Sequence, residues 1–211
     1  MQRRSFISVS AGVVLFVLMG LGLPPSAHAD KDAGAFIMKL ADKALTALTD
    51  ENISNAERAD LFRDLLQEGM DIPTVASRVL GPYVRRATDE EMKEFISLLE
   101  ENIVRKYAIM FKGYSGEAIK LIDTKSLRGD MQQVTVAIRR TNGEPPVEVR
   151  WIVHKVDGQN KIIDIIVERV SMVTTQKEEF VSVIRRGGGK VESLLGELRE
   201  RNAELATNVK D

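Results

Sequence analysis

The spacing of apolar residues changes twice along the chain, and this double change constrains the fold more than any other sequence feature. From residue 33 to residue 110, apolar residues recur every three or four positions, which is typical of amphipathic helices. After Ser171 the same helical spacing returns. Between these regions, four segments alternate between apolar and polar residues, the pattern of half-buried strands: 119–123, 134–138, 147–153 and 163–167. This order predicts an α+β fold with N-terminal helices, a four-stranded antiparallel sheet and C-terminal helices.

Turn and capping signals place the element boundaries. Ser54 and Thr88 each precede a Glu at the third following position, which is the capping box of a helix start. Gly81-Pro82 predicts the end of a short third helix. Asn142-Gly143 and Asp157-Gly158 are hairpin-type turn pairs, and short turns join antiparallel neighbours. We therefore expect a meander, with a polar tail after about residue 201.

The N-terminus is predicted to be a secretory signal peptide. Gln2-Arg3-Arg4 is a basic start, Val9 to Leu23 is an apolar run of 15 residues, and Ala27-His28-Ala29 is a small-x-small cleavage site. Fifteen helical residues span roughly 22 Å, less than the ~30 Å hydrocarbon core, which favours cleavage over an uncleaved anchor. We expect export out of the cytoplasm by the Sec or the twin-arginine route, cleavage after Ala29, and one mature domain of residues 30–211.

The mature chain has few groups that support catalysis or metal binding. The sequence contains no cysteine, which excludes disulfides, thiolate nucleophiles and Cys-type metal sites. Residues 1–29 contain two arginines, no acid and His28, so the remainder has 28 basic and 31 acidic residues, a net charge of −3 and one histidine, His154. This charge balance argues against a nucleic-acid partner. We expect no catalytic residues, no cofactor and no metal.

These absences favour an exported binding or carrier protein, because an apolar pocket between a curved sheet and helices needs few special side chains. Two alternatives stay open. A small-molecule enzyme on a cone-shaped α+β fold would need Asp123, Asp164 or His154 in its pocket. A protein-interaction module would instead show a filled core without a large cavity.

Three segments carry a resemblance to a known family. Residues 163–175 (IDIIVERVSMVTT) join the last predicted strand to a helix, and Phe180 follows as an aromatic nine residues after Ser171. Two further blocks carry the resemblance, residues 79–83 (VLGPY) and residues 143–147 (GEPPV). Together they resemble the MlaC family, also called the toluene-tolerance family. Its members are periplasmic phospholipid carriers of an ABC-type lipid-trafficking system.

The resemblance implies an MlaC-like, distantly NTF2-like fold whose curved sheet and helices enclose an apolar cavity. It implies a soluble periplasmic carrier of phospholipid acyl chains that shuttles lipid between inner- and outer-membrane complexes and maintains outer-membrane lipid asymmetry. The implied partners are a diacyl phospholipid, an inner-membrane MCE-domain ABC transporter complex and an outer-membrane lipoprotein complex, docked transiently. A hopanoid or other hydrophobic ligand is the alternative cargo. Two positions depart from the family pattern. Arg169 stands where the family usually has glycine, and Asn160 stands where it often has tryptophan.

The implied cavity should be lined by inward-facing strand residues and by the helix faces beside them. The predicted lipid-binding residues are Val79, Tyr83, Leu99, Ile103, Tyr107, Met110, Val134, Val136, Ile138, Val149, Trp151, Val153, Ile163, Ile165, Val167, Val183 and Ile184. A closed core is the alternative for each. Tyr83 and Tyr107 are expected near the mouth, since each has an apolar ring with a polar tip. Candidate phosphate or partner contacts are Arg85, Arg86, Arg139, Arg140 and Arg150, for each of which an ordinary surface charge is the alternative.

Overall fold

The computed structural model describes residues 27–114 and 116–209, with side chains from residue 32 to residue 207 in these ranges. The predicted signal peptide lies outside the described residues, except for its last three positions. The helices are α1 (Ala27–Leu48), α2 (Asn55–Gly69), α3 (Ile72–Leu80), α4 (Asp89–Tyr107), α5 (Met172–Arg186) and α6 (Glu192–Val209), with the short 3-10 helices η1 (Gly81–Arg85) and η2 (Ala108–Gly113). The strands are β1 (Ala118–Ser126), β2 (Gln132–Arg139), β3 (Val147–Val156), β4 (Gln159–Val167) and β5 (Val170–Ser171).

The predicted α+β class and the meander are confirmed. The sheet has the order β1-β2-β3-β4-β5, and every neighbouring pair is antiparallel. It has five strands and not the predicted four, because β5 contains only Val170 and Ser171 and is too short to show an alternating pattern. The turn from β4 to β5 is made by Glu168 and Arg169, both in the left-handed region with φ of 46° and 74°.

The capping boxes form as the sequence predicts. The backbone N–H of Glu57 donates to Ser54 Oγ at 3.2 Å, and the Glu57 carboxylate accepts from the Ser54 backbone at 2.8 Å. Thr88 and Glu91 make the same pair of bonds at the start of α4. These local contacts satisfy backbone donors that a helix start leaves unpaired.

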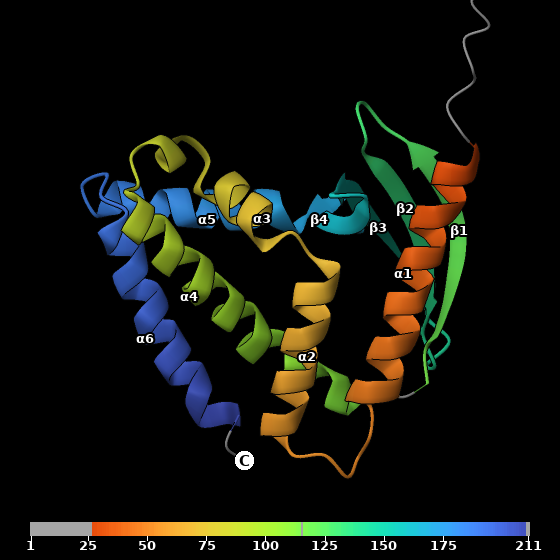
Figure 1. Cartoon of the computed structure of the whole chain (residues 1–211). Coiled ribbons are helices and arrows are strands. Elements are labelled where there is room, and N and C mark those ends of the chain that lie inside the picture. The colour runs from red at the N-terminus through yellow and green to blue at the C-terminus, as the bar shows by residue number, and fades with distance from the viewer. Residues whose placement is uncertain (1–26, 115, 210–211) are drawn as a thin grey trace, which may run out of the picture.

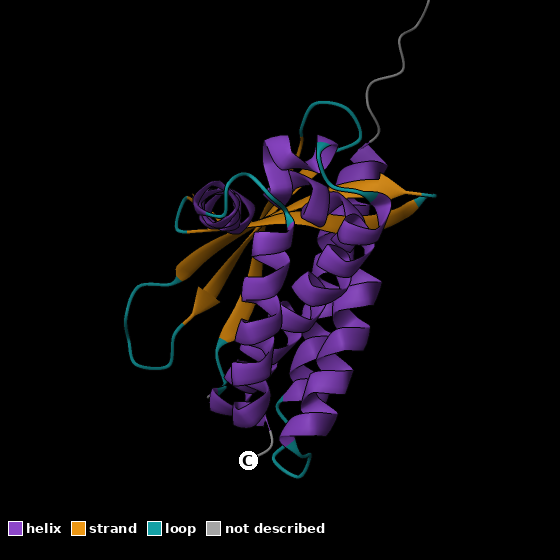
Figure 2. Cartoon of the chain, turned by 90° about the vertical axis from the view of Figure 1, so that its left-hand side faces the viewer, coloured by secondary structure: helices purple, strands orange, loops and turns teal. Residues whose placement is uncertain are grey.

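The helices form two groups that pack in different ways (Figure 1). One buried apolar cluster joins α3, α4, α5 and α6, and it includes Phe95 and Phe180, whose rings meet edge to face at 5.7 Å. A second cluster joins Ala33 and Ile37 of α1 to the inner face of the sheet. Seen from the helical end in Figure 2, the strands splay out behind the helices. The first cluster is a closed core, whereas the second lies between α1 and the sheet.

The first half of α1 approaches the sheet closely. A Cβ on Gly34 would lie 3.0 Å from Thr124 Oγ1 and 3.2 Å from Leu121 Cδ2, so this glycine lets α1 approach β1 closely. Farther along the same face of α1, Leu40, Ala44 and Leu45 are only half-buried. Space therefore opens between the second half of α1 and the sheet.

The polar C-terminal residues are helical as far as Val209. Helix α6 continues to Val209, and Asn202 is buried in it. The Asn202 amide donates to the Leu98 carbonyl at 3.0 Å and accepts from Asn102 at 2.9 Å. These hydrogen bonds hold α6 against α4 at Asn202.

Candidate functional site

Two adjoining pockets lie between the helices and the sheet. The outer pocket has a volume of about 790 Å³ and is lined by Leu45, Tyr107, Met110, Phe111, Gly113, Tyr114, Glu117, Ile119, Ile138, Arg140, Thr141, Asn142, Glu144, Val147, Val149 and Val167. The inner pocket has a volume of about 330 Å³ and is lined by Ile37, Leu40, Ala41, Ala44, Leu45, Phe62, Leu65, Leu66, Gly69, Met70, Phe111, Ile119, Ile138, Trp151, Ile162 and Ile165. Four residues line both pockets: Leu45, Phe111, Ile119 and Ile138.

The two pockets differ in polarity. The inner pocket has no charged lining residue within the described ranges, and none of its lining residues is exposed. The outer pocket reaches the loop between β2 and β3, where Thr141, Asn142 and Glu144 are exposed, and it includes Met110, which is 67% exposed. The outer pocket is therefore an open mouth, and the inner pocket is an apolar recess behind it.

Strand parity explains most of the sheet wall, and a bulge explains an exception. Trp151 pairs with Ile165, and Val149 pairs with Val167, so these four side chains share one face of the sheet. The register then shifts, because Ile152 pairs with Asp164 but Val153 pairs with Ile162. The extra residue is Ile163, and beyond it the even-numbered residues of β4 turn inward. Ile162 therefore lines the inner pocket in place of the predicted Ile163.

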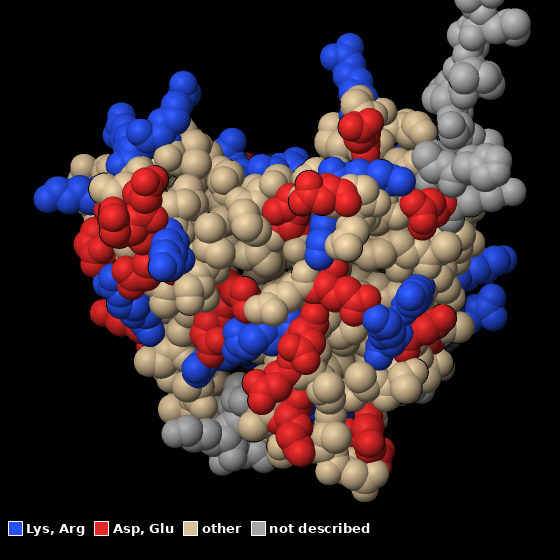
Figure 3. Space-filling model, viewed as in Figure 1, with Lys and Arg blue, Asp and Glu red and all other residues tan. Residues whose placement is uncertain are grey.

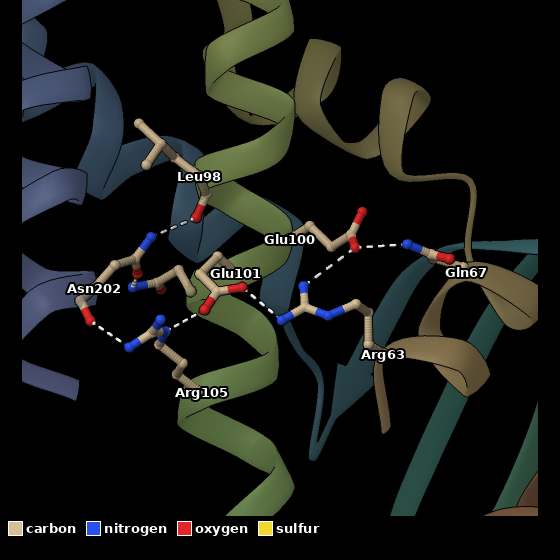
Figure 4. Close-up of polar contacts among 8 residues, drawn as sticks. Arg63, Gln67, Leu98, Glu100, Glu101, Arg105 and Asn202 are labelled. Carbon is tan, nitrogen blue, oxygen red and sulfur yellow. Dashed lines mark hydrogen bonds and ion pairs between the residues drawn. The ribbon is translucent and has the colours of Figure 1, made fainter. Parts of the chain in front are cut away.

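A polar network fixes α2, which forms one wall of the inner pocket (Figure 4). Arg63 of α2 pairs with Glu101 of α4 at 2.6 Å and with Glu100 at 3.4 Å. Arg105 also pairs with Glu101, and it donates to the Asn202 carbonyl of α6 at 3.0 Å. Burial raises the pKa of Glu101, but the hydrogen bonds from Arg105 and Arg63 outweigh it and hold the pKa below its ordinary value. Glu101 thus joins α4 to α2 directly, and Arg105, which it holds, joins α4 to α6.

A third hollow lies between α1 and α2 and differs from the other two. Its volume is about 530 Å³, and its lining includes the charged residues Lys39, Asp42, Lys43, Asp64 and Glu68. Lys43 and Glu68 pair across it at 2.6 Å. Figure 3 shows acidic and basic side chains intermixed over this side of the molecule. The charges make it a solvated cleft and not a site for an apolar ligand.

Of the predicted lipid-binding residues, seven line the two pockets. Tyr107, Met110, Val149 and Val167 line the outer pocket, Trp151 and Ile165 line the inner pocket, and Ile138 lines both. Among the five arginines, Arg140 lines the outer pocket.

The other ten predicted residues line neither pocket. Val79, Leu99, Val183 and Ile184 are buried in the closed helical core, with Tyr83 and Ile103 packed against it. Val134, Val136 and Val153 lie under the first half of α1, where helix and sheet are in contact, and Ile163 is buried at the bulge. The Arg86 guanidinium lies 5.4 Å from the centroid of the Tyr83 ring, and Tyr83 does not line the outer pocket.

The helical wall and most of the polar residues at the mouth were not predicted from the sequence. The missed wall comes from α1 and α2, through residues such as Leu40, Leu45, Phe62 and Leu65. The sequence does show their helical spacing, but the same spacing would also fit a helix packed on a closed core. From its sequence the β2–β3 loop was predicted only to be a turn, although its polar residues line the outer pocket.

The three candidate acid–base residues make structural contacts and line neither pocket. Asp164 is buried and accepts hydrogen bonds from Ser171 Oγ at 2.7 Å and from the backbone of Ile165 at 2.8 Å. His154 lies 2.9 Å from Asp71, the N-cap of α3, and Asp123 pairs with Lys125.

Burial raises the pKa of Asp71, but hydrogen bonds from Thr74 and the contact with His154 outweigh it and hold the pKa below its ordinary value. In the part of the chain that the structure describes, no three His, Asp or Glu side chains are grouped to hold a metal ion. Nor does any described helix combine the length and apolar character needed to cross a membrane.

The fold and the pockets define an α+β protein built around an apolar cavity with a polar mouth. The chain belongs to the MlaC family: the family model described as MlaC protein matches residues 38–200, which confirms the resemblance seen in the sequence. A relative from Haemophilus influenzae, named intermembrane phospholipid transport system binding protein MlaC, is 21% identical over 196 residues, which cover 89% of this chain and 90% of the relative.

A solved structure with the same fold was found by comparison with known structures. It is described as the phospholipid-binding protein from Ralstonia solanacearum in complex with a phospholipid. It matches with a TM-score of 0.75 and 23% identity, and the match covers 83% of this chain and 99% of that chain. At this identity the likeness shows the fold and leaves the ligand of this chain to be inferred.

Proposed function

We propose that this protein is a periplasmic carrier that holds phospholipid acyl chains in the inner and outer pockets and leaves the head group at the mouth. The observation that carries the proposal is the pair of adjoining pockets, one lined by apolar residues and the other ending in polar residues. Their volumes of about 790 and 330 Å³ fall within the size of ligand sites in proteins, roughly 300–1,000 Å³.

Family membership supports the same conclusion. The Haemophilus influenzae relative is named for intermembrane phospholipid transport, and the Ralstonia solanacearum neighbour is described with a bound phospholipid. The candidate acid–base residues lie outside both pockets, which favours a carrier over a small-molecule enzyme. The name of the relative, which refers to an intermembrane system, and the predicted signal peptide of residues 1–29 support a periplasmic location.

The energy of acyl-chain burial determines how such a carrier must work. Two chains of about sixteen carbons bury roughly thirty CH₂ groups, worth about 24 kcal/mol at ~0.8 kcal/mol each. Release of the lipid into water is therefore prohibitively slow. The carrier must dock on a membrane complex and pass the lipid directly to it. We accordingly propose transient docking on an inner-membrane MCE-domain ABC transporter complex and on an outer-membrane lipoprotein complex, in the service of outer-membrane lipid asymmetry.

Lipid extraction and native mass spectrometry of the purified mature protein test the proposal. We expect about one diacyl phospholipid per chain, and uptake from vesicles after delipidation. Tyr107→Asp should reduce uptake because it places a charge in the outer pocket, whereas Leu127→Asp, at an exposed position outside both pockets, is the control. Mature protein that contains no lipid and takes none up would contradict the proposal. If the bound ligand were a hopanoid, the proposed cargo would be wrong and the carrier role would stand.

A further inference from the structure

The mouth of the outer pocket carries both signs of charge. Its charged lining residues in the described chain are Arg140, Glu117 and Glu144. One arginine and two glutamates give this lining a formal charge of −1. Behind them the inner pocket is uncharged. A ligand with apolar tails in the inner pocket therefore places its polar end among these three residues.

Arg140 and Glu144 form a preset pair on the β2–β3 loop. Nη1 of Arg140 donates to Oε2 of Glu144, and the side chain of Asn142 accepts from the Glu144 backbone at 3.1 Å. The hydrogen bonds from Arg140 and Asn142 hold the pKa of Glu144 below its ordinary value, so the carboxylate stays charged. The loop thus fixes a cation and an anion side by side at the mouth.

Both members of this pair are open to a further ion. Their side chains are 38% and 53% exposed. A guanidinium has five N–H donors and a carboxylate has two oxygens, and the contact between them uses Nη1 and Oε2. The guanidinium can therefore also bind a phosphate oxygen, and the carboxylate can also bind an ammonium group.

We infer that the mouth selects zwitterionic, amine-bearing head groups of the phosphoethanolamine type over anionic head groups, with the phosphate at Arg140 and the ammonium at Glu144. This inference rests on the proposed function, because the acyl chains supply most of the affinity. An anionic head group brings its phosphate to the same arginine but offers no cation to Glu144. The net negative lining disfavours it further.

Competitive loading tests the inference. Delipidated protein is incubated with vesicles of equal parts phosphatidylethanolamine, phosphatidylglycerol and diacylglycerol with identical acyl chains, and the bound lipids are quantified by mass spectrometry. We expect the wild-type protein to be enriched in phosphatidylethanolamine. Glu144→Gln should lower the ratio of phosphatidylethanolamine to phosphatidylglycerol by about two- to fivefold, the range for one exposed ion pair. Arg140→Gln should lower uptake of both phospholipids relative to diacylglycerol, which has no phosphate.

Glu148→Gln is the matched control, because Glu148 also pairs with an arginine, Arg150, but lines neither pocket. Normal lipid uptake with the same head-group ratio in Glu144→Gln and Glu148→Gln would overturn the inference and leave the proposed function intact. Wild-type uptake in the proportions of the vesicle would also overturn it. A wild-type protein that takes up no lipid would overturn the proposed function and this inference with it.

Discussion

Leu45 on α1 and Ile138 on β2 each line both the outer and the inner pocket, so the passage between the two pockets lies between this helix and the sheet. Both side chains are half-buried, unlike Ala33 and Val134 nearer the first turns of α1, which are fully buried. An acyl chain that enters at the mouth must pass between these two side chains to reach the inner pocket.

We therefore expect Leu45→Trp to block the passage. The larger ring enters open space, so the free energy of unfolding should change by less than about 1 kcal/mol. Lipid occupancy should fall by about tenfold or more, since forcing an acyl chain past the larger side chain should cost roughly 1–3 kcal/mol of binding free energy. Native mass spectrometry measures occupancy and urea unfolding measures stability. Leu127→Trp, at an exposed leucine outside both pockets, is the control, and wild-type occupancy in Leu45→Trp would contradict the blocked passage.

Trp151 offers a direct signal of lipid in the inner pocket, because it is the only tryptophan of the chain and lines that pocket. We expect its emission to shift to shorter wavelength when delipidated protein is loaded from vesicles. Trp151→Phe should abolish the signal and lower the free energy of unfolding by no more than about 1.5 kcal/mol, because the indole Nε1 has no hydrogen-bond partner among the described residues. Identical emission before and after loading would show that the lipid does not reach this residue.

Much of the fold was predictable because its boundaries are set by local contacts. The capping boxes at Ser54 and Thr88 and the turn at Asn142-Gly143 need only neighbouring residues to form. Strand β5 was not predictable, since two residues show no period. The bulge at Ile163 was not predictable either, because Ile162 and Ile163 are both apolar and only pairing with β3 decides which of them faces inward.

The site was less predictable than the fold, for a different physical reason. An apolar helix face has the same sequence pattern whether it meets other side chains or lines a cavity. Val183 and Ile184 were therefore predicted to line the pocket and lie in the closed core, whereas Leu40 and Leu45 were not predicted and line a pocket. Packing between elements that are distant in sequence makes the distinction.

This distinction between pocket and core predicts opposite outcomes for two similar substitutions. Ile165→Asp places the carboxylate in the inner pocket, where water can enter, so the fold should survive and lipid should be lost. Ile184→Asp places it in a closed core at 0% exposure and should lower the free energy of unfolding by more than about 4 kcal/mol. Circular dichroism and lipid extraction measure both effects. Equal unfolding of the two variants would mean that Ile165 belongs to a filled core.

Backbone strain at Arg169 predicts a stabilising substitution. Arg169 has a φ of 74° in the turn between β4 and β5, a region that favours glycine over residues with a Cβ. Arg169→Gly should raise the free energy of unfolding by about 1 kcal/mol, as judged by urea unfolding. Arg128→Gly, in the loop between β1 and β2, removes the same charge as a control. A destabilised Arg169→Gly would show that the arginine side chain stabilises the turn by more than the strain costs.

Glu101 should make the fold sensitive to acid. Its pKa lies below its ordinary value because the hydrogen bonds from Arg105 and Arg63 outweigh the opposing effect of burial. A carboxylate with a lowered pKa stabilises the fold at pH values above its ordinary pKa. That contribution is lost as pH falls through the lowered pKa. At pH 7, Glu101→Gln should lower the free energy of unfolding by about 1 to 2 kcal/mol, and the difference from the wild type should shrink below about pH 4. Urea unfolding at pH 7 and pH 3.5 measures this, with Glu178→Gln at an exposed position of α5 as the control. A difference that stays constant between the two pH values would mean that charge on Glu101 does not hold α2, α4 and α6 together.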